Sequence, residues 1–359
     1  MYKKKDYLKA IFSMSITNTI KRMPKIVLHD HLDGGLRPAT IIELAHKYNL
    51  SLPADTPQQL AQWFVQESTS KDLHRCLRAF AITCSVMQSK EDIMRVTYEM
   101  MEDLHLDNVV YVETRFCPYL HTQQGLTMSE VVDSVLSGLQ LGKEKFGVEY
   151  GLIICGIRNF EDNVNLEIAK LCSTHQQRGV VGFDFAGADK GFPLTRQTLT
   201  ISYLQQHSIP FTTHAGEADN IHSIIEALDF RTLRIGHGCQ LLSTDDIKLI
   251  ESVTKRIKQT NTHIEVNISS NLGTGVISGY ESHPIKYFLS NGISISINPD
   301  DRLMFNNTTS SEYLLASQYY NITEQDLRQM NINAIKSSFA SQNLKDQIIK
   351  QYYSGDHQE

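Results

Sequence analysis

Two histidines, His29 and His31, stand two residues apart just after the short apolar run 26–28. In a β-strand the side chains repeat every two residues, so both imidazoles would point to the same face. In a helix they would lie about 200° apart, on different faces. Two imidazoles on one face at a strand end are half of a metal site. Because such a pair also arises without a metal, its meaning depends on the rest of the chain.

Further imidazoles and carboxylates follow three later apolar runs. They are His214 and Glu217 after the run 211–213, His237 after 233–236, and Asp300 and Asp301 after 293–297. Each has a structural alternative: His214 as a core histidine, His237 as a strand cap, and the two aspartates as a solvated turn. Their joint position at strand ends favours a shared site instead. Three imidazoles and one carboxylate suit a borderline divalent metal, most simply Zn²⁺.

The elements that must bring these residues together follow a regular order along the chain. Eight apolar runs predict strands, and helical sequence follows each of them. The predicted strands are 26–31, 109–116, 151–157, 180–186, 211–214, 233–237, 264–268 and 293–297. Such alternation implies parallel pairing, and eight units predict a closed (β/α)8 barrel of the TIM type. Barrel enzymes place their sites at the carboxyl ends of the strands, where the residues above lie.

Helical patterns fill the remaining sequence. A helix begins near Pro38, and a long helical insertion from 58 to 107 separates the first strand from the second. The later predicted helices lie near 129–146, 163–178, 194–207, 222–228, 244–258 and 284–291, with C-terminal helices from 310 to 353. No repeat, linker or low-complexity segment divides the chain. We therefore expect a single barrel domain over residues 24–359, preceded by a loose basic tail over residues 1–23.

The composition is that of an ordinary globular protein, with 41% hydrophobic and 21% charged residues among 359. The net charge of -6 argues against nucleic acid or an anionic membrane as the main partner. No apolar run approaches the roughly 18 residues of a membrane span, and the N-terminus is too short and interrupted for a secretion signal. The six cysteines are scattered, which predicts buried free thiols in a reducing compartment, the cytoplasm.

Together these motifs resemble those of the adenosine deaminases, a family of the metal-dependent amidohydrolase superfamily. The resemblance runs from about residue 26 to 352, and the motifs appear in the family's order. The matching pieces are HDHLDG at 29–34, GFDFAG at 182–187, HAGE at 214–217, RIGHG at 234–238, SSNL at 269–272 and NPDD at 298–301, with 331–339 similar to the family's closing helix.

The resemblance implies a zinc site with four protein ligands. These ligands are His29, His31, His214 and Asp300. A catalytic water takes the remaining position, and zinc lowers the pKa of such a water towards about 7. Related barrel hydrolases with two metals bring a carboxylated lysine from the fourth strand. Since the run 183–186 has no lysine, we expect one Zn²⁺ per chain.

The implied reaction adds water to the purine carbon that bears the amino group and then releases ammonia. Glu217 matches the family's acid, which protonates purine N1, and such a carboxyl needs its pKa raised by burial. His237 matches the residue that orients and assists the water. Asp300 is expected to be catalytic as well as a ligand.

Substrate contacts follow from the same resemblance. Asp301 matches the group at purine N7, and the backbone N–H of Gly187 matches the donor to N3. Asp33 matches the residue at the ribose 5′-hydroxyl, and His31 is counted with the substrate-binding residues. A carboxylate at that position would repel a 5′-phosphate, so a nucleoside suits the pocket better than a nucleotide. The alternative for Asp33 is a turn residue before two glycines.

Two aromatic residues of the insertion have two interpretations. Trp63 and Phe64 lie with Leu60 at helical spacing, which usually marks a stripe that faces the core. The family uses apolar residues in this region as a flap over the sugar. We therefore also count Trp63 and Phe64 as candidate substrate contacts.

We expect a zinc-dependent enzyme that converts adenosine and 2′-deoxyadenosine to the inosine products, with a small-molecule nucleoside as its partner. The nearest alternatives are sister activities on adenine, 5′-modified adenosines or aminofutalosine, followed by a non-catalytic nucleoside-binding barrel. Two departures from the family pattern bear on substrate choice but leave the ligands intact. Pro299 stands where Thr or Ser is usual, and Arg302 stands where animal members have Pro. The sequence does not set the oligomeric state.

Overall fold

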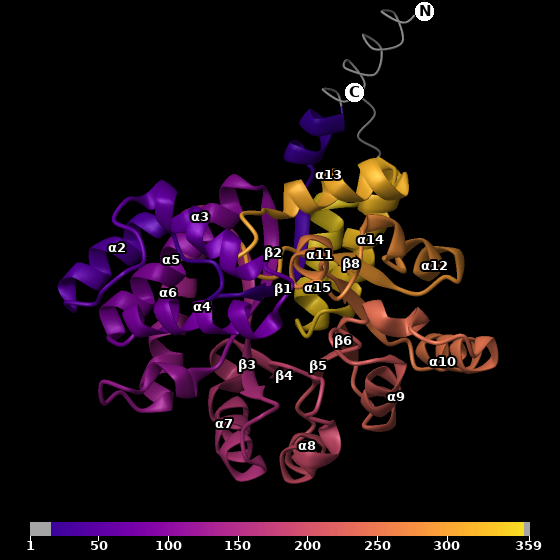
Figure 1. The fold of residues 1–359 in the computed structure, drawn as a ribbon, viewed down its shortest axis with the longest axis horizontal. Coiled ribbons are helices and arrows are strands. Elements are labelled where there is room, and N and C mark those ends of the chain that lie inside the picture. Colours follow the sequence, from indigo (N-terminus) through magenta and orange to yellow (C-terminus); the bar gives the residue numbers. More distant parts are fainter. Residues whose placement is uncertain (1–15, 355–359) are drawn as a thin grey trace, which may run out of the picture.

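Eight short, mostly apolar segments form a parallel sheet in which each strand pairs with the next along the chain. The computed structural model describes residues 16–354. The strands are β1 (Lys25–His31), β2 (Val109–Phe116), β3 (Glu149–Ile157), β4 (Val180–Ala186), β5 (Phe211–Ala215), β6 (Arg234–His237), β7 (His263–Val266) and β8 (Ile295–Ile297). A bridge between Asp30 and Asp300 joins the ends of β1 and β8, which nearly closes the sheet into a barrel (Figure 1). The predicted (β/α)8 architecture is confirmed.

Helices surround the sheet on its outer side. They are α2 (Pro38–Lys47), α3 (Pro57–Ser68), α4 (Leu73–Val86), α5 (Lys90–Leu106), α6 (Met128–Phe146), α7 (Asp162–His175), α8 (Thr198–Gln206), α9 (Ile221–Asp229), α10 (Ile247–Gln259), α11 (Ile268–Gly273), α12 (Ile285–Ser290), α13 (Thr309–Tyr320), α14 (Glu324–Ser337) and α15 (Gln342–Tyr352). Short 3₁₀ turns lie at Pro118–His121, Gln176–Arg178, Leu194–Gln197, Cys239–Leu242 and Tyr280–Ser282. In Figure 1 the insertion helices α2 to α5 lie on one side of the molecule, opposite α9, α10 and α12.

The helical insertion between β1 and β2 is not one continuous helix. It consists of α3, α4 and α5, with breaks at residues 69–72 and 87–89. Thr56 and Ser89 explain where α3 and α5 begin, because each side-chain oxygen accepts a backbone N–H in the first turn of the helix that follows. The predicted helical content is thus confirmed, and its division into three helices brings α4 over the end of the barrel.

A second difference from the predicted elements lies after β7. We expected a strand from 264 to 268, whereas β7 ends at Val266 and Ile268 begins the short helix α11. Ile268 is fully buried in that helix. Because a buried apolar run looks the same whether it continues a strand or begins a helix, its hydrophobicity did not distinguish the two.

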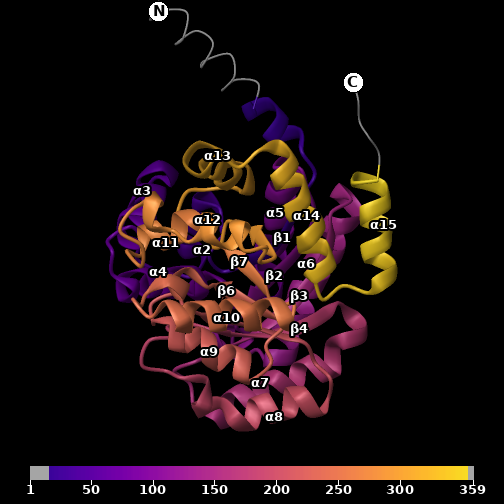
Figure 2. The ribbon, with the colours of Figure 1, turned by 90° about the vertical axis from the view of Figure 1, so that its right-hand side faces the viewer.

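One large cluster of buried apolar residues joins the strands to the surrounding helices. A separate smaller cluster packs β1 and β2 against the last two helices, with Ile26, Tyr111, Ile335 and Ile348 among its buried members. In Figure 2, α14 and α15 lie side by side at this part of the molecule. The C-terminal helices therefore pack on the barrel that carries the site residues. No helix within residues 16–354 is long and apolar enough to cross a membrane.

The N-terminal stretch differs from the loose tail that we expected over residues 1–23. Residues 1–15 lie outside the described part of the chain. Residues 16–22 are helical, and Ile20 has no exposed surface. The buried Lys25 ammonium donates to the carbonyls of Met23 at 2.9 Å and Asp107 at 2.7 Å. The described end of this stretch is therefore anchored to the barrel. The single-domain organisation over residues 24–359 stays a prediction.

Candidate active site

Four side chains that the sequence places at strand ends meet at the carboxyl end of the barrel. They are His29 and His31 on β1, His214 on β5 and Asp300 just after β8. One possible ligand atom from each lies within 4.8 Å of the others. His31 Nε2 lies 3.3 Å from His214 Nε2, and His29 Nε2 lies 3.0 Å from an Asp300 oxygen. Nitrogen and oxygen atoms at these separations can share one divalent ion.

The backbone around Asp300 holds its carboxylate against β1. The Asp300 N–H donates to the His29 carbonyl at 3.2 Å, and the His31 N–H donates to the Asp300 carbonyl at 2.9 Å. Asp300 has a φ of 64°, in the left-handed region that residues with a side chain usually avoid. His237 shares this conformation, with a φ of 69°. Such backbone conformations gather at functional sites, where the surrounding contacts hold them in place.

Buried carboxylates face the second ring nitrogen of two of these histidines. Glu265 on β7 lies 2.8 Å from His29 Nδ1, and Asp184 on β4 lies 3.2 Å from His214 Nδ1. A carboxylate at Nδ1 fixes a proton there and leaves the Nε2 lone pair free, the usual arrangement behind a metal-bound histidine. The buried Nε2 of His29 has no hydrogen-bond donor and faces an acceptor oxygen of Asp300. A cation between the two removes this conflict, so the residues fit a metal ion.

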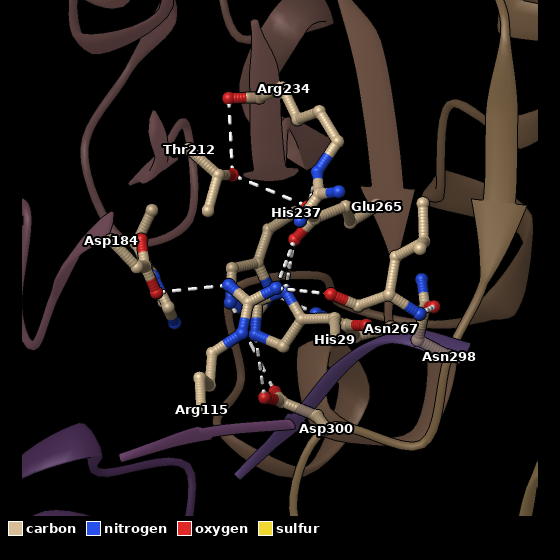
Figure 3. A network of polar contacts seen from close by, with 12 residues as sticks. His29, Arg115, Asp184, Thr212, Arg234, His237, Glu265, Asn267, Asn298 and Asp300 are labelled. Carbon is tan, nitrogen blue, oxygen red and sulfur yellow. Dashed lines mark hydrogen bonds and ion pairs between the residues drawn. The ribbon is translucent and has the colours of Figure 1, made fainter. Parts of the chain in front are cut away.

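An ionic network inside the barrel supports these carboxylates (Figure 3). Arg115 on β2 donates to Asp184 at 2.9 Å and to Glu265 at 2.8 Å. Arg234 on β6 donates to the other Glu265 oxygen at 2.6 Å and also to Glu113. All five side chains are fully buried. Although burial alone favours the neutral acid, the two guanidinium groups keep the pKa of Glu265 well below its usual range. The carboxylate behind His29 therefore stays ionised.

Glu217 lies just after β5 and is suited to hold a proton. Its carboxyl lies 3.7 Å from His237 Nε2, and the side chain is almost fully buried. Burial raises the pKa of Glu217 to about 8, and the nearby carboxylates of Asp189 and Asp300 add to the effect. A carboxyl with such a pKa is mostly protonated at neutral pH and can act as a general acid.

His237 is held in one orientation by two asparagines. The Asn271 amide donates to His237 Nδ1 at 2.9 Å, and the Asn267 amide lies 3.2 Å from the same nitrogen. Because Nδ1 accepts, the hydrogen of the neutral ring is on Nε2, which points towards Glu217 and Asp300. Burial lowers the pKa of His237 well below its usual range, so the ring stays neutral. It therefore presents an N–H to the centre of the site.

A small cavity beneath α4 brings three of the four candidate ligands together with Glu217 and His237. Its lining residues are His31, Cys76, Phe80, Gly187, His214, Glu217, His237, Ser270, Thr274, Asp300, Asp301 and Phe305. A larger, more open hollow lies beside Arg37 and Asp103, and none of the predicted site residues lines it. Because the chemistry-bearing side chains share the smaller cavity, we take that cavity as the candidate active site.

The predicted substrate contacts divide into two groups. His31, Gly187 and Asp301 line the cavity, whereas Asp33, Trp63 and Phe64 do not. Phe64 is fully buried in the main core, and Trp63 packs against that core from a partly exposed position. The helix that covers the cavity is α4 rather than α3, which carries both aromatic residues. Their role as a flap over the sugar stays a prediction.

Asp301 lies deep in the cavity beside the glycine turn that follows β1. A Cβ atom on Gly34 would lie 2.1 Å from an Asp301 oxygen, so the carboxyl occupies space that only glycine leaves free. The same oxygen is buried and has no hydrogen-bond partner within residues 16–354. Burial raises the pKa of Asp301 well above its usual range, and the adjacent Asp300 carboxylate adds to the shift. Asp301 is therefore a polar group that awaits a partner.

Asp33 lies in a buried group with Cys84 on α4 and His121 after β2. The His121 Nδ1–H donates to the Met87 carbonyl at 3.1 Å, so Nε2 is left as an acceptor. That Nε2 lies 3.7 Å from an Asp33 oxygen, and the Cys84 sulfur lies 3.8 Å from the same oxygen. Neither His121 Nε2 nor the second Asp33 oxygen has a hydrogen-bond partner in the described part of the chain. Apart from the Cys84 thiol, which is directed at Asp33, this group offers only acceptors.

Several cavity residues were missed in the sequence. Cys76 and Phe80 are four residues apart on α4, and Ser270 and Thr274 have the same spacing at α11. A spacing of four residues indicates one helix face, but it does not indicate that the face looks onto a site. Phe305 follows β8 in a segment without regular structure, and no sequence signal marked it.

Comparison with known proteins gives one consistent family. The chain matches the family model described as "Adenosine deaminase" over residues 24–354. The adenosine deaminase of Mycobacterium marinum is 35% identical, over 94% of this chain and 96% of that protein. The adenosine deaminase of Mycobacterium sp. (strain JLS) is 39% identical, over 93% of this chain and 96% of that protein.

Solved structures share the fold. An adenine deaminase from Arthrobacter aurescens superposes with a TM-score of 0.82 at 24% identity, and covers 91% of this chain and 97% of its own. The N6-methyl-AMP deaminase from Arabidopsis thaliana gives a TM-score of 0.82 at 24% identity, over 95% of this chain and 99% of its own. At these identities the likeness establishes the barrel architecture.

Proposed function

The chain belongs to the adenosine deaminase family, and we propose that it hydrolyses adenosine and 2′-deoxyadenosine to inosine and 2′-deoxyinosine with release of ammonia. One observation carries the proposal beyond family membership. Three of the four proposed ligands, His31, His214 and Asp300, line one cavity together with Glu217 and Asp301, and the fourth, His29, lies buried against Asp300. This arrangement supports a catalytic barrel over a barrel that only binds nucleosides.

We propose one Zn²⁺ per chain as the cofactor. Its ligands are His29, His31, His214 and Asp300. Three imidazoles with one carboxylate are a donor set that zinc prefers, and the carboxylates behind His29 and His214 support the assignment. When bound, zinc lowers the pKa of a water molecule and so supplies hydroxide at neutral pH.

Glu217 and His237 have complementary roles in this proposal. The Glu217 carboxyl donates its proton to purine N1, which makes C6 a better electrophile for water. The His237 Nε2–H is directed to the same region and orients the attacking oxygen. The two asparagine amides at Nδ1 keep the ring from turning this hydrogen away. Asp300 completes the set as a ligand whose oxygens also face the catalytic groups.

The purine contacts are proposed from residues that line the cavity. The Gly187 N–H is assigned to N3 and the Asp301 carboxyl to N7, with His31 also lining the space beside the ring. Asp301 has an oxygen without a partner, and purine N7 is an acceptor. A protonated Asp301 would therefore satisfy both groups at once.

The sugar is proposed to extend along α4 towards Asp33. Cys76, Phe80 and Cys84 follow one another at spacings of four residues, so they lie along one face of α4. The first two line the cavity, and Cys84 contacts the Asp33 group. A ribose 5′-hydroxyl can donate to the acceptors there, whereas a 5′-phosphate brings only negative charge. This arrangement supports a nucleoside as the substrate rather than a nucleotide.

A cytoplasmic location is part of the same proposal. The six cysteines are all buried and free within the described structure. Free thiols of this kind are typical of proteins kept in reducing compartments.

A panel of substrates tests the proposed function. Purified protein is assayed for ammonia release with adenosine, 2′-deoxyadenosine, adenine, AMP and 5′-methylthioadenosine. We expect both nucleosides to be turned over, with kcat/KM at least about 10²-fold lower for the other three, because those lack the 5′-hydroxyl or the sugar. Preference for adenine or AMP would reject the nucleoside assignment. Turnover of none of the five by metal-loaded protein would reject the enzymatic function.

A further inference from the structure

We infer that Asp189 is a positioning residue that holds the general acid Glu217 in its reactive place. The inference rests on the proposed deaminase function, because Glu217 acts as an acid only in that reaction. Asp189 lies in the segment after β4, two residues beyond Gly187, and only 1% of its surface is exposed.

Four donors from the segment after β5 converge on the Asp189 carboxylate. One oxygen accepts the Glu217 N–H at 3.2 Å and the Ser223 hydroxyl at 3.1 Å. The other oxygen accepts the N–H groups of Ala218 and Asp219, each at 3.0 Å. Three consecutive backbone N–H groups, beginning with that of Glu217, are therefore held by one side chain from a neighbouring strand end.

The Glu217 carboxyl has no comparable support of its own. Within residues 16–354 we find no hydrogen bond to its side chain, and its close polar neighbour is His237 Nε2 at 3.7 Å. The backbone before it is fixed at Gly216, whose φ is 60° and where a Cβ atom would lie 2.6 Å from Ile224. The direction of the Glu217 side chain therefore depends on the backbone that Gly216 and Asp189 hold on either side.

Arg158, just after β3, joins the segment after β4 to the end of β5. Its guanidinium donates to the His214 carbonyl at 2.5 Å and to the Phe192 carbonyl at 2.8 Å. The segments after β4 and β5 are thus tied together both behind the ligand His214 and behind Glu217. An ionised carboxylate suits this place because it only accepts, while an amide would turn an N–H towards one pair of donors.

The experiment compares Asp189→Asn with wild type in steady-state adenosine deamination. We expect kcat to fall at least about tenfold with KM within about threefold, because a small displacement of a catalytic group lowers turnover more than binding. Bound metal per chain should stay unchanged. In the Glu217→Gln background the same substitution should lower kcat no further, since a residue that acts through Glu217 has nothing left to position.

Asp162 provides a matched control on the outer side of the barrel. Its carboxylate accepts the N–H groups of Leu199 at 2.8 Å and Thr200 at 3.0 Å, and the Thr200 hydroxyl at 2.7 Å, far along the chain from any site residue. Asp162→Asn should lower thermal stability while kcat stays close to wild type. If Asp189→Asn does not fold, Asp189→Glu takes its place, because it keeps the charge and moves it by one methylene. We expect the same result for it: a lower kcat with little change in KM.

Three results would overturn the inference. The first is an unchanged kcat in a folded Asp189 variant, and the second is an equal loss of kcat in Asp189→Asn and Asp162→Asn. The third is a double variant, Asp189→Asn with Glu217→Gln, whose loss of kcat is the product of the losses in the two single variants. Each of these three results can be obtained only if the wild-type protein deaminates adenosine. Inactive wild type would instead contradict the proposed function itself, so the two failures are distinguishable.

Discussion

Glu217 and Asp300 face the same cavity but differ in protonation. Burial raises the pKa of Glu217 to about 8, whereas the His29 imidazole holds the pKa of Asp300 well below its usual range in spite of burial. One carboxyl can therefore give a proton at neutral pH, while the other is an anion suited to hold a cation. When the environments of two carboxyl groups move their pKa values in opposite directions, one group can act as an acid while the other stays ionised.

Replacing Glu217 tests its role as the acid. Glu217→Gln keeps the shape of the side chain but removes the transferable proton. We expect kcat to fall by at least about 10²-fold, the usual scale for loss of a general acid, with metal content unchanged. The check is kcat for adenosine together with elemental analysis of the same preparation. Near-normal turnover would exclude Glu217 as the proton donor.

His121 provides a test of the sugar end. If its Nε2 accepts from the 5′-hydroxyl, His121→Leu should lower kcat/KM for adenosine by roughly threefold to tenfold, the scale of one hydrogen bond. 5′-Deoxyadenosine lacks that hydroxyl, so its kcat/KM should stay the same in wild type and variant. Cys84→Ser serves as the control, because it keeps a donor towards Asp33. An equal loss for both substrates would show that His121 does not read the hydroxyl.

At the scale of elements, short helices and segments that follow the strands add residues to the site that the strand ends form. α4 covers the cavity with Cys76 and Phe80, and α11 brings Asn271 to His237. Glu312 on α13 holds the start of α11, since its carboxyl accepts the Ser269 N–H at 3.1 Å and also the Ser269 hydroxyl. The orientation of His237 thus depends on a helix that follows β8.

Glu312 makes stability depend on pH. Burial raises the pKa of Glu312 to about 7, above the roughly 4.3 of an exposed glutamate. The folded state therefore binds this proton more tightly than the unfolded chain does. Its contribution is fully present below about pH 4.3 and is lost as pH rises to about 7, a change of about 4 kcal/mol.

Chemical denaturation of wild type and Glu312→Gln from pH 4.5 to 8 measures the pH-dependent contribution of Glu312 to the free energy of unfolding. The free energy of unfolding of wild type, relative to the variant, should fall as the pH rises through that range. A constant difference between the two proteins across the range would show that Glu312 has the same pKa in both states.

At the scale of the whole molecule, much of the fold could be predicted because parallel barrel strands are continuous apolar runs. β2 and β4 begin and end at the predicted residues, 109–116 and 180–186. The meeting of the candidate site residues at one end of the barrel could also be predicted, because they follow such runs and parallel strands end on one face. Which of them bind the metal was implied by the family resemblance and stays a prediction.

The parts of the site that could not be predicted from the sequence depend on contacts between segments that are distant along the chain. Arg115, Glu265 and Arg234 stand inside apolar runs, and their network appears only when the barrel brings β2, β7 and β6 together (Figure 3). Asp189 likewise looks like an ordinary loop aspartate until the segment after β5 lies against it. A single sequence shows which residues end a strand, but it does not show which side chains face one another across the barrel.

Titration of metal-free protein with Zn²⁺ tests the proposed zinc-dependent deamination. We predict that adenosine deamination is absent after chelation, rises in proportion to added Zn²⁺, and saturates at about one bound ion per chain, the ratio that four ligands for one ion imply. His214→Ala should neither bind the ion tightly nor regain activity. Full activity in metal-free protein, saturation at two ions per chain, or normal metal content in His214→Ala would show that the site is not a catalytic single-zinc site.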